Sequence, residues 1–266
     1  MKAPFFAAVA LVAVTFAGVA QAGPTSTLYL TNGSGFVVVQ GNTIVNSFPI
    51  AYSTSYEIPI AVYGDVRTAG YLSGTQGGQY TLGGTPTGTS YAWPGVVTDA
   101  YDSTTDGSHN YLVNYGNGDI FQTARDFTNP TLLFNVGQSI VGITYDRANN
   151  SLWFSTWSGI LVVDYSLSGI LLSSFSTGHE LNASLAMDPA DHTLWLVNDR
   201  SGTTNYGYLE QYSTAGALLS TGPYVGYTLG GEFNLAPNTT PEPGTLVMFG
   251  SGILGLAGVL RRKINL

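Results

Sequence analysis

Residues 141–175 read VGITYDRANNSLWFSTWSGILVVDYSLSGILLSSF, and the fold is most readily inferred from this stretch. It holds four short runs rich in β-branched and aromatic residues, which are residues 141–146, 152–156, 159–165 and 169–175. Pairs of polar or glycine residues separate the runs, namely Asn149-Asn150, Ser158-Gly159 and Ser168-Gly169. Such pairs form tight turns between antiparallel strands. The stretch therefore predicts one unit of four antiparallel strands.

The same unit follows once more along the chain, with runs at residues 183–188, 193–197, 207–212 and 216–220. Asp146 and Asp188 are 42 residues apart, and so are Trp153 and Trp195. Two landmarks that share one period indicate a repeated structural unit.

Two weaker copies precede these units. One has runs at residues 97–102, 110–114, 118–122 and 131–134, and its Asp102 lies 44 residues before Asp146. The other opens at residues 58–63 and continues at 70–72 and 79–82. Four-stranded antiparallel units that repeat in this way are typical of a β-propeller. A β-sandwich is the alternative all-β architecture, but it does not predict the recurrence.

A fifth blade is predicted from the two ends of the domain. Residues 230–237 resemble the first strand of a blade and have no hairpins after them. Residues 27–31, 35–40 and 43–48 resemble later strands that lack a first strand. We therefore expect residues 233–236 to pair with residues 28–31, which removes two open sheet edges. The predicted fold is all-β, a propeller of five four-stranded blades with a composite closing blade.

The N-terminus predicts a signal peptide over residues 1–22. Met1-Lys2 is a short basic start, residues 5–19 are apolar and helix-forming, and Ala20-Gln21-Ala22 is a small-x-small pattern. These three features in this order indicate export, with cleavage after Ala22.

The C-terminus combines Pro241-Glu242-Pro243, an uncharged run at residues 244–260, and Arg261-Arg262-Lys263. As a helix the run is roughly 25 Å long, enough to cross a thin bilayer, and the basic residues favour the cytoplasmic side. The alternative is a buried core helix, for which the run lacks a polar stripe. Residues 241–266 are thus expected to be a transmembrane tail, and residues 23–240 the exported propeller domain.

This tail resembles the PEP-CTERM sorting signal of exopolysaccharide-producing Gram-negative bacteria. The resemblance rests on Pro241, Glu242 and Pro243, the glycine-rich run, and Arg261, Arg262 and Lys263. It implies an exosortase that processes the chain near the Pro-Glu-Pro motif after transient anchoring in the inner membrane. It also implies delivery to the cell envelope, the outer surface or the extracellular matrix. The repeats themselves loosely resemble the NHL and YVTN types of propeller repeat.

The charge of the exported region restricts its partners. Fifteen carboxylates face four arginines there and lysine is absent, so its formal charge is about −11. An acidic surface repels phosphate backbones, which disfavours nucleic acid as a partner. The chain has no cysteine, so packing and strand pairing must stabilise the fold.

Four aspartates, Asp65, Asp102, Asp146 and Asp188, recur near the end of a first strand in successive blades. They are candidate ligand contacts if they form a ring at the channel mouth. The other interpretation is that each one caps the turn that follows it. Asp99, Asp102 and Asp106 weakly resemble a calcium loop but lack its ligand spacing, so no metal site is assigned and Ca²⁺ is only a weak expectation.

Trp93 and Trp157 lie in loop contexts, where an exposed ring stacks on sugars or simply packs. Trp153 and Trp195 are expected in the core between blades. His109, His179 and His192 lack the spacing of metal ligands and are interpreted as turn residues. No nucleophile elbow, P-loop or dinucleotide fingerprint is present, so no catalytic residue is assigned.

These observations favour a non-enzymatic binding or structural module of the cell surface or exopolysaccharide matrix. The alternative is a carbohydrate-active enzyme, a glycoside hydrolase or lyase, that uses paired carboxylates in the channel. A third possibility is a matrix component without a discrete ligand.

Overall fold

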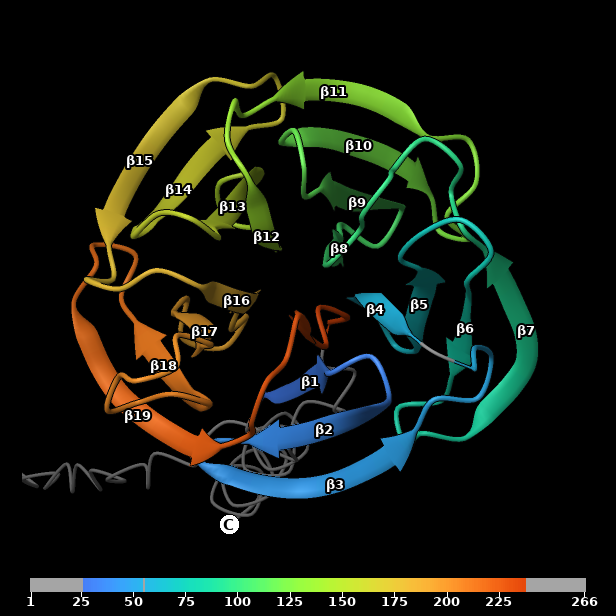
Figure 1. The fold of residues 1–266 in the computed structure, drawn as a ribbon, viewed down its shortest axis with the longest axis horizontal. Helices are drawn as coiled ribbons and strands as arrows, with labels where there is room; N and C mark the ends of the chain where they lie inside the picture. Colours follow the sequence, from blue (N-terminus) through green and yellow to red (C-terminus); the bar gives the residue numbers. More distant parts are fainter. Residues whose placement is uncertain (1–25, 55, 238–266) are drawn as a thin grey trace, which may run out of the picture.

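Residues 26–54 and 56–237 are described in the computed structural model of the 266-residue chain. They form twenty strands in five four-stranded antiparallel sheets, which surround one axis as the blades of a propeller (Figure 1). No helix occurs in this part of the chain, and none there is long and apolar enough to span a membrane. The predicted all-β, five-bladed propeller is confirmed. The expected signal helix and C-terminal span lie outside the described residues.

Four blades are each one continuous stretch of chain, and their strands run in order from the axis outward. Blade 1 contains β4 (Glu57–Val62), β5 (Val66–Gly70), β6 (Gln76–Tyr80) and β7 (Pro86–Ala92). Blade 2 contains β8 (Ser103–Thr105), β9 (His109–Asn114), β10 (Asp119–Ala124) and β11 (Thr131–Asn135). Blade 3 contains β12 (Ile140–Asp146), β13 (Ser151–Thr156), β14 (Leu161–Ser166) and β15 (Leu171–Ser176). Blade 4 contains β16 (Asn182–Met187), β17 (Leu194–Asn198), β18 (Tyr208–Tyr212) and β19 (Leu218–Tyr224).

Blade 5 joins the two ends of the domain, as predicted. Its strand order is β20-β1-β2-β3, formed by β20 (Gly230–Phe233), β1 (Thr27–Thr31), β2 (Gly35–Gln40) and β3 (Thr43–Pro49). The register differs from the prediction, because Gly230–Phe233 pairs with β1 and only Phe233, opposite Leu28, belongs to the expected segment.

After one further backbone hydrogen bond, from the Asn234 amide to the Thr27 carbonyl at 3.1 Å, the chain crosses to blade 1. The Leu235 amide donates to the Val62 carbonyl at 3.1 Å, and the Asn234 side chain accepts from the Gly64 amide at 2.9 Å. The end of the domain therefore ties blade 5 to blade 1 as well as closing its own sheet.

The first strand of blade 2 corrects a second prediction. Residues 97–102 form a loop, and the strand is the short polar segment β8 that follows. Val97 and Ala100 are fully buried in that loop, so their hydrophobicity imitates a strand in the sequence. In blade 1, β5 ends where residues 70–72 were expected, and the polar outer strand β7 was missed.

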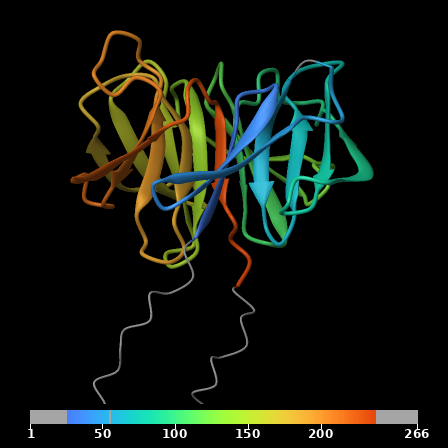
Figure 2. The same cartoon turned by 90° about the horizontal axis from the view of Figure 1, so that it is seen from below.

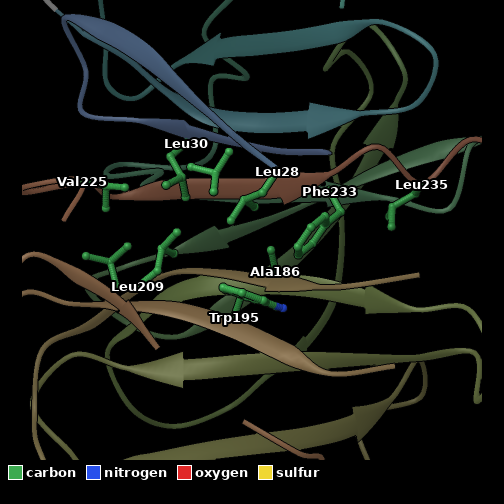
Figure 3. Packing of buried hydrophobic residues seen from close by; sticks show 10 residues of the cluster. Leu28, Leu30, Ala186, Trp195, Leu209, Val225, Phe233 and Leu235 are labelled. Atoms are coloured by element: carbon green, nitrogen blue, oxygen red, sulfur yellow. The ribbon is translucent and has the colours of Figure 1, made fainter. Parts of the chain in front are cut away.

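Neighbouring blades pack through buried aromatic and aliphatic side chains. Trp195 of blade 4 faces Leu28 and Phe233 of blade 5 (Figure 3), with 6.3 Å between the Trp195 and Phe233 ring centroids. Trp153 occupies the equivalent place between blades 3 and 4, beside Phe175. The expectation that both tryptophans form inter-blade core is confirmed.

The ring has two different faces. Figure 2 shows the start of β1 and the end of β20 at the same end of the ring, and Ser26 and Pro237 line one small cavity there. We call this the terminal face, and it also carries the turns between first and second strands. We call the opposite end the mouth face, where the first strands begin and the second strands end.

Candidate functional site

One equivalent position in every blade brings a side chain to the mouth face. It is the residue directly after the second strand, and blades 1 to 5 supply Tyr71, Tyr115, Trp157, Asp199 and Asn32. In blades 2 to 4 its amide donates to the carbonyl of a residue shortly before the first strand, at 2.9 to 3.2 Å. The repeated backbone therefore places five unlike side chains around one axis.

Aromatic rings from three blades form a continuous chain around this end of the channel. The centroid distances are 5.3 Å from Tyr56 to Tyr71, 6.2 Å from Tyr71 to Tyr101, 4.9 Å from Tyr101 to Tyr115 and 6.3 Å from Tyr115 to Trp157. Most of these contacts are edge-to-face, which holds each ring at a fixed angle. We call these five residues, with Tyr227 from the segment before β20, the aromatic mouth.

The floor of the aromatic mouth is apolar and comes from the tops of the innermost strands. Its buried residues belong to four different blades and are Ile58, Val141, Ala183 and Leu229. Two adjoining hollows lie over it, with volumes of about 210 and 60 Å³, and both are lined by Tyr101, Tyr227 and Leu229. The site is thus a shallow bowl with an apolar base and aromatic walls.

Hydroxyl groups give the bowl its polar chemistry. Burial raises the pKa of Tyr71 and of Tyr101, and it raises the pKa of Tyr227 to about 12. These three phenols therefore stay protonated at neutral pH and are available as hydrogen-bond donors. Tyr56 and Tyr227 are 45% and 46% exposed, so their rings are accessible from solvent.

Asp199 differs from the other residues at the repeated position. It is 4% exposed, and neither carboxylate oxygen makes a hydrogen bond within the described part of the chain. Burial raises the pKa of Asp199 to about 8, and the Thr228 amide nearby opposes this rise. Its charge in turn helps to raise the pKa of Tyr227. An unpaired carboxylate therefore lies buried next to the bowl.

The channel below the bowl is filled by side chains. Asp102 and Glu232 are fully buried there, and Asp102 accepts from the amides of Ser103, Gly231 and Ile143 at 2.9 to 3.1 Å. Glu232 accepts from the Thr104 hydroxyl, from the Thr144 hydroxyl at 3.2 Å and from the Phe233 amide at 3.0 Å.

Burial raises the pKa of both carboxyl groups well above the usual range, and the Glu232 charge raises that of Asp102 further. Both groups join neighbouring blades and neither meets solvent. The paired carboxylates that an enzyme would use are thus enclosed in this structure.

The structure does not bring the four candidate aspartates together. Asp102 precedes its first strand and lies in the channel. Asp65 and Asp188 follow their first strands and Asp146 ends its own, all on the terminal face. The aspartate of blade 2 that follows its first strand is Asp106. Asp102 and Asp146, although 44 residues apart, are therefore not at equivalent positions of their blades.

Turn capping by these aspartates is visible directly. Asp146 accepts from the amides of Ala148 and Asn149 at 2.9 and 3.2 Å, and from His192 at 2.9 Å. Asp106 and Asp188 make the same kind of contact to the amides of their own turns. Asp65 instead forms ion pairs with Arg67 of blade 1 and Arg125 of blade 2.

The two tryptophans that were expected in loops, Trp93 and Trp157, lie in different parts of the structure. Trp157 belongs to the aromatic mouth, but Trp93 lies outside it and donates its indole N–H to the Val97 carbonyl at 2.6 Å. His109 and His192 pair with Asp106 and Asp146, and His179 pairs with Glu210. Within residues 26–54 and 56–237, no group of three or more acidic or histidine side chains is placed to hold a metal ion.

Five mouth residues, Tyr56, Tyr71, Tyr101, Tyr115 and Tyr227, and the buried Asp199 were not identified from the sequence. A signal for four of the five repeated positions exists, because Tyr71, Tyr115, Trp157 and Asp199 follow one another at intervals of 44, 42 and 42 residues. The side chains differ in type, so the period alone did not reveal them.

The comparison with protein families finds the PEP-CTERM protein-sorting motif at residues 239–263. This confirms the sorting signal expected from Pro241, Glu242 and Pro243 and the closing basic residues. Such a signal implies an exported protein of Gram-negative bacteria that is sorted by an exosortase and passes through the membrane. The motif, and the expected cleavage site at Ala20 and Ala22, lie outside the described residues.

A solved structure with a TM-score above 0.5 supports the fold. A chain in the crystal structure of a nidogen/laminin complex is 13% identical, with a TM-score of 0.55, over 79% of this chain and 99% of that one. A protein of unknown function from Bacteroides caccae is 12% identical, with a TM-score of 0.46, over 74% and 73%. Virginiamycin B lyase from Staphylococcus aureus is 15% identical, with a TM-score of 0.45, over 72% and 63%. At such identities the likeness concerns the propeller fold alone, in keeping with its NHL/YVTN-like repeats. No curated protein matches the sequence.

Proposed function

We propose that the exported domain is a non-enzymatic binding module of the cell surface or exopolysaccharide matrix, and that the aromatic mouth binds neutral polysaccharide. The observation that carries this proposal is the bowl itself, with an apolar floor, a chain of five aromatic rings and protonated phenols. A sugar ring has an apolar face and a rim of hydroxyl groups, which match a stacked ring and a phenol respectively.

The charges near the bowl favour a neutral polysaccharide over an anionic one. Asp99 lies close enough to Tyr71 and Tyr101 to raise the pKa of both, and Asp199 acts likewise on Tyr227. No basic residue lines the two hollows. An anionic polymer would therefore meet the carboxylate of Asp99 and no cation, whereas a neutral chain avoids this repulsion.

The position of the site suits display at a surface. The sorting motif follows Pro237, which lies on the terminal face, and the aromatic mouth opens on the other face. A domain held by its C-terminal tail then presents the bowl away from its attachment point.

Burial of Asp102 and Glu232 supports binding over catalysis. A glycoside hydrolase or lyase that works through channel carboxylates would need them in contact with substrate. Both are 0% exposed and occupied by hydrogen bonds between blades.

The test is binding of neutral oligosaccharides to a fragment of residues 23–240, which contains every strand of the closed ring. We expect saturable binding by calorimetry, and a loss of at least about tenfold in affinity for Trp157→Ala, since a central aromatic contact is often worth about 2 kcal/mol. Trp93→Ala is the matched control, because Trp93 is a partly exposed tryptophan outside the bowl. Equal losses from both variants, or no binding by the parent fragment, would contradict the proposal.

A further inference from the structure

A second cavity, of about 590 Å³, opens on the terminal face between blades 4 and 5. One wall comes from β1, β20 and the turn between β2 and β3, and the other from β17 to β19 and the turn after β16. Its volume lies in the range of small-molecule sites. The cavity is far from the aromatic mouth, because it lies at the other end of the same strands.

The inner side of this cavity is apolar. Leu28, Val39 and Phe233 line it from blade 5, and Trp195 lines it from blade 4. The indole N–H of Trp195 is already used, since it donates to the Thr193 hydroxyl at 3.2 Å. The indole therefore contributes its ring to the cavity and not a further donor.

The outer side is acidic. Asp188 and Asp191 line it together with Gln211 and Asn42, and no lysine, arginine or histidine does. Asp188 is 9% exposed, and its Oδ1 accepts from the Ala190 amide at 2.8 Å. Asp191 accepts from the Thr193 amide at 3.0 Å and from Gln211 at 3.2 Å.

Both carboxylates thus retain acceptor capacity, because each one has about four lone-pair sites. Burial, with a contribution from the Asp191 charge, raises the pKa of Asp188, as expected for a carboxylate without a cation beside it.

We propose that this cavity binds an amino sugar, a hexosamine unit with a free ammonium group. The ammonium would lie between Asp188 and Asp191 and donate hydrogen bonds to their carboxylates. Such charge-assisted hydrogen bonds are stronger than those between neutral groups. The apolar face of the sugar would lie against Trp195, and its hydroxyl groups would meet the amides of Gln211 and Asn42.

The acidic lining also disfavours other classes of sugar. A uronic acid would place a third carboxylate beside Asp188 and Asp191, and an N-acetylated sugar lacks the cation. Arg147 lines the adjoining cavity of about 190 Å³, which shares Ser26 and Ala190 with this one. Arg147→Ala should therefore strengthen binding of a cation slightly.

The test compares four sugars, glucosamine, N-acetylglucosamine, glucose and glucuronate, by nuclear magnetic resonance titration of the 23–240 fragment at neutral pH. We expect glucosamine to bind at least tenfold more tightly than the other three and to shift the Trp195 indole resonance. Equal affinities, or shifts confined to Trp157, would overturn the proposal. Absence of glucosamine binding would overturn it too.

Two variants locate the site. The double variant Asp188→Asn, Asp191→Asn should lower glucosamine affinity at least tenfold. Because Asp188 also caps a turn, Gln211→Lys provides a second route, since it introduces a positive charge into the cavity without touching that turn. Trp93→Ala is the control and should leave glucosamine binding unchanged, because Trp93 lines neither this cavity nor the aromatic mouth. If Gln211→Lys binds glucosamine as tightly as the parent, the cavity is not the site.

Discussion

The two faces of the ring are built from the same strands but follow different rules. On the terminal face, Asp106, Asp146 and Asp188 repeat because each one caps the turn of its own blade. On the mouth face, the position after each second strand is equally regular in its backbone, yet it carries Tyr, Tyr, Trp, Asp and Asn in turn. A repeated residue serves the repeated unit, whereas varied residues on a repeated backbone are available for a shared site.

The largest effect is expected from removing β20, the strand that closes the ring. Deleting residues 230–237 removes β20, with Glu232 and the Leu235 contact to blade 1, and leaves β1 as an open edge. We expect loss of the cooperative unfolding transition and of ligand binding. Deleting residues 238–266 should change the unfolding free energy by less than about 1 kcal/mol.

Circular dichroism during thermal melting measures both deletions. The chain that lacks residues 238–266 and ends at Pro237 is the control for the chain that lacks residues 230–237. If the two melt alike, the composite blade does not close the ring.

A repeated aspartate of the terminal face should affect stability without affecting binding. Asp146→Ala removes a buried acceptor of two turn amides and of His192, and it should cost about 2–3 kcal/mol. Urea unfolding measures the loss. The affinity for a neutral oligosaccharide should stay within about twofold, and a large drop in that affinity with the fold retained would show that the faces are not independent.

The smallest effect concerns the one carboxylate at the repeated mouth position. The folded-state pKa of Asp199 is about 8 and its ordinary value is 3.8, so the folded chain holds this proton more tightly than the unfolded chain does. Stability is therefore lost as pH rises from about 4 to about 8. Asp199→Asn should remove this part of the loss and raise the unfolding free energy by on the order of 2 kcal/mol at pH 8.5.

Urea midpoints of parent and Asp199→Asn between pH 4 and pH 9 check this expectation. Some slope should remain in the variant, because burial also raises the pKa of Asp102 and Glu232. Parallel curves for the two proteins would contradict the assignment of Asp199 as an unpaired buried carboxylate.

The sequence predicts the fold better than the site, for a physical reason. Blades 3 and 4 follow the hydrophobic pattern of their strands closely, so their 42-residue period gave the blade count and the closing sheet. Blade 2 lacks this hydrophobic pattern in its first strand. The buried side chains of β8 are polar, and Thr104 forms hydrogen bonds to other blades inside the channel.

The site was only partly predictable. Trp157 was recognised as a candidate from its loop context, but Tyr56, Tyr101 and Tyr227 come from loops between blades that share no period. Their meeting depends on the closure of the ring, which places residues from the two ends of the chain around one axis. Asp102 was assigned to the wrong position, since the loop of residues 97–102 imitates a strand.

Hydrogen–deuterium exchange with and without a saturating neutral oligosaccharide tests the central claim most directly, that the mouth face is the ligand face. We expect slowed exchange in peptides that contain Tyr56, Tyr101, Tyr115, Trp157 and Tyr227, and unchanged exchange in the turns after Asp106, Asp146 and Asp188. Slowed exchange in those turns, with the mouth peptides unchanged, would contradict it.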